Sequence, residues 1–184
     1  RTGPGDREKL NLDTMAPNLT YISPAGGILQ QISLARAVHQ ASIRHLSVTA
    51  TGVVAFAMQW EGDRVAAPAL LGLHRLDDPA PVLAMAPPED HAAMQGYAGS
   101  VAFLDADRQV AISSPKGGRV QVFDQNGRYA YTIARQDVCG LAAIGAALVM
   151  TDGFSTIVKS LNGMPTSHRR ANRAYDNHLV AVTV

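Results

Sequence analysis

One apolar unit recurs along the chain and restricts its fold more than any other feature of the sequence. The unit is a short apolar strand, a turn that contains Gly or Asp, and a second apolar strand. Equivalent apolar residues mark four copies at intervals of 55, 40 and 38 residues: Leu46, Val101, Leu141 and Leu179. A mean interval of about 44 residues is typical of the four-stranded blades of a β-propeller.

A second kind of hairpin lies between the copies. Its turns contain Gly-Gly or Asn-Gly pairs at 26–27, 126–127 and 162–163, and one further hairpin turns at 77–79. Such pairs supply the positive φ angles that tight hairpins need. We therefore predict an all-β fold of propeller-like blades, each with four antiparallel strands named a to d from the axis outwards. Helix is expected only at 32–41 and 88–95.

The same spacing predicts the domain organisation. Three complete blades are expected at roughly 43–85, 100–134 and 140–170. The chain begins with a c–d pair and ends with a single a strand, so we expect residues 1–184 to form one propeller-like domain or the C-terminal half of one. The alternative is a sandwich of six to ten strands in which the repeat period is accidental.

Composition excludes several classes of protein. Apolar residues make up 47% of the chain and charged residues 17%, which excludes a disordered chain. The formal net charge of +1 is too small to indicate a nucleic-acid partner. The chain contains no run of 18 apolar residues, which is the length needed to span a membrane. Cys139 is the only cysteine, which excludes an internal disulfide and a four-cysteine zinc site.

The unusual polar and aromatic residues of this chain concentrate in two classes of loop. In a propeller the d–a and b–c loops share one face, around the mouth of the central channel, and loops on a rigid scaffold often carry binding groups. The binding residues predicted on this basis are Arg44, His45, Gln59, Trp60, Tyr97, Ser100, Asp137, Cys139, Asp176, Asn177 and His178. Asp78 and Asn126 are expected in c–d turns on the opposite face.

Several chemical roles are open to these residues. His45 and His178 occupy the same repeat position, and Cys139 lies one step earlier in its blade, so two imidazoles and a thiolate could hold a metal ion. The alternative is that each histidine bonds a neighbouring loop and that the cysteine is a core residue. Ser100 lacks the surroundings of a nucleophile elbow. Aspartates at 137, 152 and 176 could form an acidic ring, or could simply cap turns.

Seven phrases of the sequence also resemble a known family in the same order. They are KLNLDTM (9–15), SIRHL (42–46), GLHR (72–75), GYAGSV (96–101), SSPKGG (113–118), DVCG (137–140) and DNHL (176–179). The family is an uncharacterised bacterial one of exported, propeller-like proteins. Its members carry twin-arginine signals, and their genes often lie beside those of imelysin-type proteins. The resemblance implies a periplasmic protein, of which this chain is the C-terminal half, and no catalytic residue can be carried over from it.

The expected function follows from the fold and the resemblance together. We favour a non-enzymatic binding or scaffold propeller of the cell envelope, linked to iron acquisition, over an enzyme. One alternative is a metal-dependent lactonase-like hydrolase with its site at the channel mouth, and another is a protein-interaction module. The expected partner is the missing N-terminal half, or another chain, paired along the strand edges that half a propeller exposes at 179–184.

Overall fold

Strands dominate the described part of the chain, which is residues 9–63, 67–106, 108–176 and 178–182 of this computed structural model. The first sheet contains β3 (Ala41–Val48), β4 (Val53–Trp60), β5 (Leu71–Arg75) and β6 (Val82–Ala84). The second sheet contains β7 (Ser100–Leu104), β8 (Gln109–Ser114), β9 (Arg119–Asp124) and β10 (Tyr129–Ala134). The third sheet contains β11 (Val138–Ile144), β12 (Ala147–Asp152), β13 (Thr156–Leu161) and β14 (Met164–Arg170). A two-stranded sheet contains β1 (Asn18–Ile22) and β2 (Ile28–Ser33).

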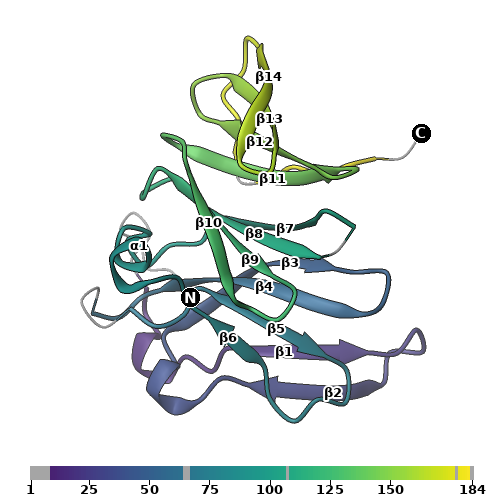
Figure 1. Cartoon of the computed structure of the whole chain (residues 1–184). Helices are drawn as coiled ribbons and strands as arrows, with labels where there is room; N and C mark the ends of the chain where they lie inside the picture. The colour runs from purple at the N-terminus through teal and green to yellow at the C-terminus, as the bar shows by residue number, and fades with distance from the viewer. Residues whose placement is uncertain (1–8, 64–66, 107, 177, 183–184) are drawn as a thin grey trace.

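The sheets are arranged as the blades of a propeller. Each four-stranded sheet is antiparallel and keeps its strands in chain order. The initial strands β3 and β11 both contact β7, which identifies these three strands as the inner edge of the arc. Figure 1 shows the sheets stacked in sequence, with β1–β2 at one end and β11–β14 at the other. The prediction of an all-β, propeller-like fold is therefore confirmed.

The predicted hairpin turns form because their residues adopt positive φ. Asn162 and Gly163 have φ angles of 49° and 79° between β13 and β14, and Gly127 has a φ of 83° between β9 and β10. These left-handed conformations cost little for Gly and Asn and favour a two-residue connection. Turn chemistry therefore determines where the outer strands of the second and third sheets end.

The core lies between the sheets and follows the alternation of strand side chains. Val110 and Ile112 of β8 pack toward the first sheet, whereas Ala111 between them packs toward the third. A separate cluster buries Leu19 and Ile32 of β1–β2 against the first sheet. A strand buried on both faces in this way reads as a continuous apolar run, which is how these segments read in the sequence.

Three of the expected elements differ in the structure. The helix expected at 32–41 is wrong: β2 continues to Ser33, a single 3-10 turn spans Arg36–Val38, and β3 begins at Ala41. The reason is that Ile32 is buried against Leu19 in a strand pair, and packing overrides the helix propensity of the local sequence. The second expected helix is present and shorter, as α1 (Pro88–Ala92), and a further 3-10 turn spans Leu12–Thr14.

The single a strand expected at the C-terminus is also absent from the described residues. Residues 178–182 carry no strand assignment, and residues 183–184 lie outside the described part of the chain. A strand is defined by hydrogen-bonded pairing with a neighbour, and residues 178–182 pair with no strand, although a Cβ at Gly140 of β11 would lie 2.9 Å from Cβ of Leu179. No helix in the described residues is long and apolar enough to cross a membrane.

Candidate functional site

Strand pairing brings the two predicted classes of loop to one face. Ala41 at the start of β3 lies opposite Trp60 at the end of β4. Ser100 pairs in the same way with Ser113, and Val138 with Asp152. The d–a and b–c loops therefore surround the same end of the sheets, which we call the mouth face. The turn at Asn126 joins the opposite ends of β9 and β10.

The structure places Arg44 and His45 within β3 and not in the loop before it, so that part of the expected arrangement is wrong. The register of β3 against β4 shifts between Ile43 and His45, which leaves Arg44 in a bulge. Bulges redirect side chains, and Arg44 lies 3.6 Å from the carboxylate of Glu61, which is also paired with Lys9. Glu61 and its two basic partners, Arg44 and Lys9, lie at the mouth end of the first sheet.

His45 and His178 form a ring pair that joins β3 to the C-terminal segment. Their ring centroids are 4.9 Å apart, with the planes tilted by 48°. Burial lowers the pKa of His45, and the neighbouring His178 and Arg44 lower it further, while Asp176 opposes them. His45 is therefore held in its neutral form, which lets the two rings approach each other. The sequence analysis placed the two histidines at equivalent repeat positions, and the structure brings their rings together.

Trp60, Gln59 and Tyr97 form a packed corner of the mouth face. Trp60 packs between two hydrophobic clusters, and its indole nitrogen donates to the carbonyl of Asp63 at 2.6 Å. Gln59 forms an isolated bridge with Tyr97. The Lys116 ammonium lies 4.8 Å from the centroid of the Tyr97 ring, a cation–π contact. Trp60 is thus a packing residue, and Tyr97 positions Lys116.

Ser100 joins the second and third sheets and does not lie in a nucleophile's surroundings. Its Oγ is buried and accepts a hydrogen bond from the backbone N–H of Leu141 at 3.1 Å. The Oγ of Ser113, directly opposite on β8, donates to the carbonyl of Cys139 at 2.6 Å. Both hydroxyls satisfy backbone groups at the inner edge of the third sheet, as buried polar groups must.

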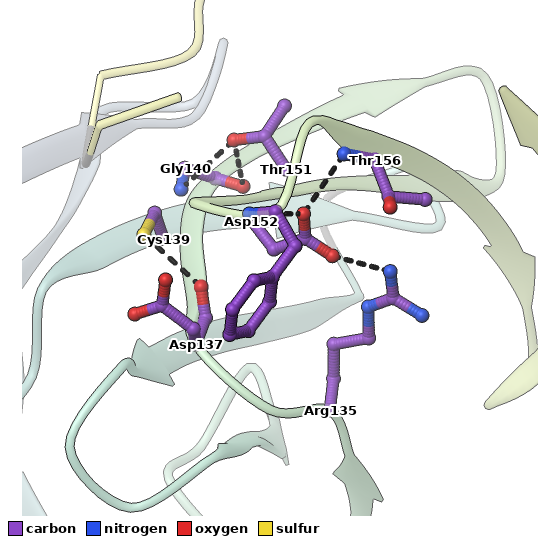
Figure 2. A network of polar contacts seen from close by, with 8 residues as sticks. Arg135, Asp137, Cys139, Gly140, Thr151, Asp152 and Thr156 are labelled. Atoms are coloured by element: carbon purple, nitrogen blue, oxygen red, sulfur yellow. Dashed lines mark hydrogen bonds and ion pairs between the residues drawn. The ribbon is translucent and has the colours of Figure 1, made fainter. Parts of the chain in front are cut away.

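Cys139 and Asp137 lie at the entry to β11, within the polar network of Figure 2. The thiol of Cys139 donates to the carbonyl of Asp137 at 3.1 Å. Burial and the nearby carboxylates of Asp137 and Asp176 raise the pKa of Cys139 to about 11, against the N–H of Gly153, which lowers it. At neutral pH this cysteine is a protonated thiol, whereas metal binding and nucleophilic attack both require a thiolate.

Asp152 is the centre of the same network and was not among the predicted binding residues. Its carboxylate is 1% exposed and pairs with Arg135 (Figure 2). It also accepts from the backbone N–H groups of Phe154 at 3.0 Å and Thr156 at 2.8 Å, which closes the turn between β12 and β13. Asp152 therefore caps the turn, which was the alternative to an acidic ring considered for this aspartate.

A groove of about 590 Å³ opens on the mouth face between the second and third sheets. We call it the mouth groove, and three loops line it: Pro115–Gly118, residues 134–137 and Phe154. Phe154 is 54% exposed there, although it is one of the largest apolar side chains. Asp137 was among the predicted binding residues, but the sequence prediction missed Lys116, Phe154, Arg135 and Gln136, because only the fold brings their loops together.

The remaining predicted residues lie in the C-terminal segment. Asp176 and His178 are exposed, and Asn177 lies outside the described residues. Among the residues that the structure describes, no three His, Cys, Asp or Glu side chains are placed to hold a metal ion. The structure therefore brings His45 and His178 together, and the carboxylate of Asp176 lies near both this ring pair and Cys139.

Stacked four-stranded sheets with their initial strands along one inner edge define a β-propeller-like protein. The chain belongs to the family described as "Protein of unknown function (DUF1513)", whose model matches residues 1–182. None of the curated proteins with which the sequence was compared matches it.

Solved structures with the same fold are distant in sequence. A catalytically inactive virginiamycin B lyase from Staphylococcus aureus with quinupristin matches with a TM-score of 0.65 at 11% identity, over 88% of this chain and 50% of the lyase. U3-55K matches with a TM-score of 0.58 at 15% identity, over 74% of this chain and 42% of that one. Sqt1 from Saccharomyces cerevisiae matches with a TM-score of 0.58 at 17% identity, over 81% and 41%. The chain thus spans about half the length of these structures, and the likeness shows the fold alone.

Proposed function

We propose that this chain is a non-enzymatic binding scaffold that recognises a segment of a protein partner in the mouth groove. The observation that carries the proposal is the exposed Phe154 in a groove bordered by Lys116. Aromatic side chains, Phe among them, are enriched at protein interfaces, where a polar rim surrounds the apolar core. The groove is open and shallow, which suits an extended segment better than an enclosed small molecule.

The charges of the groove suggest the kind of segment. Arg135 and Lys116 both line the groove; Arg135 is paired with Asp152, and the ammonium of Lys116 lies over the ring of Tyr97. The carboxylate of Asp137 lies at the other border. A partner segment with an apolar side chain for Phe154 and a carboxylate for Lys116 matches this arrangement.

The state of the other polar groups favours binding over catalysis. The buried hydroxyls of Ser100 and Ser113 bond backbone groups of the third sheet, and the thiol of Cys139 is protonated at neutral pH. A lactonase-like hydrolase would need several ligands around one metal ion, and no described residues form such a group.

We propose further that the protein acts in the periplasm, as part of iron acquisition. Support for this comes from the resemblance of the seven sequence phrases, and the mouth groove is the surface that a partner in the envelope would meet. The proposal of a binding scaffold does not depend on this location.

A peptide display library of extended random sequences tests the binding proposal. Selection on the wild-type chain should enrich peptides with an apolar residue next to Asp or Glu. Phe154→Ala and Lys116→Ala should each weaken the selected peptides about tenfold, since each removes one anchor. Val82→Ala is the matched control, because Val82 is also 54% exposed and lies on β6 away from the groove. Equal affinity for all four proteins, or no enrichment, would overturn the proposal.

A further inference from the structure

A pocket of about 360 Å³ lies between the first and second sheets, on the face opposite the mouth. It is lined by the β3–β4 turn, the end of β5, and the β7–β8 and β9–β10 turns, and we call it the turn pocket. The two sheets pack on each other through one hydrophobic cluster, which fixes the walls of the pocket. Its volume lies at the lower end of the range for small-molecule sites, which suits a ligand with a single ring.

Arg75, at the end of β5, supplies the turn pocket with a positive charge. One of its guanidinium nitrogens donates to the carbonyl of Thr51, which anchors the group at the pocket wall. No carboxylate among the described residues pairs with Arg75. Asp105 bonds Arg108 at 2.8 Å, and Asp124 accepts from two backbone N–H groups of its own turn. The other guanidinium N–H groups of Arg75 can therefore bind the carboxylate of a ligand, with the fork geometry that suits this pair.

Neutral hydrogen-bonding groups accompany this cation. The buried hydroxyl of Thr49 accepts from the backbone N–H of Val53 at 2.9 Å and shares a hydrogen bond of 3.1 Å with the hydroxyl of Thr51. On the wall that belongs to the second sheet, the carboxamides of Gln125 and Asn126 form no hydrogen bond within the described residues. Hydroxyl and carboxamide groups both donate and accept, so this lining suits a ligand that carries several hydroxyls.

An aromatic ring and a strained turn complete the lining. Phe103 of β7 is 7% exposed and borders the pocket, where its ring offers an apolar surface to the carbon face of a ligand. Asp105 and Ala106 of the β7–β8 turn have φ angles of 54° and 52°. This left-handed backbone is unfavourable for Ala, and such strain is found at ligand-binding sites.

We propose that the turn pocket binds an acidic monosaccharide, a sugar ring that carries one carboxylate. The carboxylate pairs with the guanidinium of Arg75, the hydroxyls bond Thr51 and the carboxamides of the β9–β10 turn, and the carbon face packs on Phe103. A neutral sugar lacks the ion pair, and a simple carboxylate lacks the hydroxyl contacts, so both bind more weakly. This site is separate from the mouth groove and does not depend on the function proposed for that groove.

Calorimetric titration with glucuronate is the first test. The wild-type chain should bind glucuronate in a saturable manner, at least about tenfold more tightly than glucose or acetate. Arg75→Gln should weaken glucuronate binding at least about tenfold, because it removes the charged partner. Arg169→Gln is the matched control, since Arg169 is also exposed and lies on β14 of the third sheet. Absence of glucuronate binding, equal affinity for glucose or acetate, or equal affinity in the two variants would overturn the proposal.

Amide chemical shifts of the isotope-labelled chain then locate the bound sugar. Glucuronate should shift the amides of Thr51, Gln125 and Asn126 and leave those of the mouth groove unchanged. Thr51→Val removes one hydroxyl at an exposed position and should weaken binding about threefold. Both this variant and Arg75→Gln should otherwise keep the wild-type spectrum, which shows that the fold is intact. Shifts confined to the mouth groove, or spread evenly over the chain, would contradict the proposal.

Discussion

Arg135, which follows the last strand of the second sheet, forms an ion pair with the buried carboxylate of Asp152 in the third sheet. Removal of the guanidinium would leave a carboxylate that is 1% exposed with only backbone partners. We expect Arg135→Met to reduce the free energy of unfolding by about 2 kcal/mol, measured by urea denaturation. Arg128→Met, in an exposed turn, is the control and should change it little. Equal effects of the two substitutions would show that the pair contributes nothing specific.

The ring of Phe56 lies against the backbone of Gly72 in the first sheet, where a side chain at position 72 would otherwise be. A Cβ at Gly72 would lie 2.0 Å from Cζ of Phe56, and both residues are buried. We expect Gly72→Ala to cost about 1–3 kcal/mol by overpacking, measured by thermal and urea unfolding. A smaller side chain at position 56 should relieve the clash, so the double variant with Phe56→Leu should lose less than the sum of the single losses. Gly27→Ala is the control, because Gly27 has an ordinary φ and only a 3.4 Å contact.

Much of the fold could be predicted because its determinants are local. Gly127 and Asn162-Gly163 mark hairpins by their conformational preference alone, and the apolar runs between such turns have the length of strands. One error, the helix expected at 32–41, arose where packing of Ile32 against Leu19 outweighs local propensity. That packing joins two strands that the sequence pattern had already paired.

The candidate site was less predictable, because its geometry depends on contacts between blades. The repeat register placed His45 and His178 at equivalent positions, but their ring contact depends on the path of the C-terminal segment, and the bulge in β3 that places Arg44 near Glu61 has no sequence signal. Phe154 has no unusual neighbours in sequence. Its exposure in the mouth groove follows from three loops that only the stacked sheets bring together.

The ring pair at His45 predicts a pH dependence of stability. The pKa of His45 is lowered from 6.5 in the folded chain, so the folded state binds fewer protons than the unfolded state. Its contribution to stability is complete above about pH 6.5 and is lost as the pH falls below that value. We expect His45→Gln to flatten the fall in melting temperature between about pH 7 and pH 5. His168→Gln, on exposed β14, is the control, and a steeper fall in His45→Gln would contradict the explanation.

The thiol of Cys139 predicts slow alkylation in the folded chain. Its pKa is raised from 9.0 to about 11, so the thiolate fraction at pH 8 is about 100-fold below that of an unperturbed thiol. Burial at 7% exposure slows the reaction further. Iodoacetamide labelling followed by mass spectrometry should therefore be at least about 100-fold slower in the folded than in the urea-unfolded chain. Asp137→Asn removes one of the carboxylates that raise the pKa, so it should speed labelling of the folded chain without changing the unfolded rate. Labelling of the folded wild type at the unfolded rate would show a reactive thiolate, and would reopen the metal hypothesis for this residue.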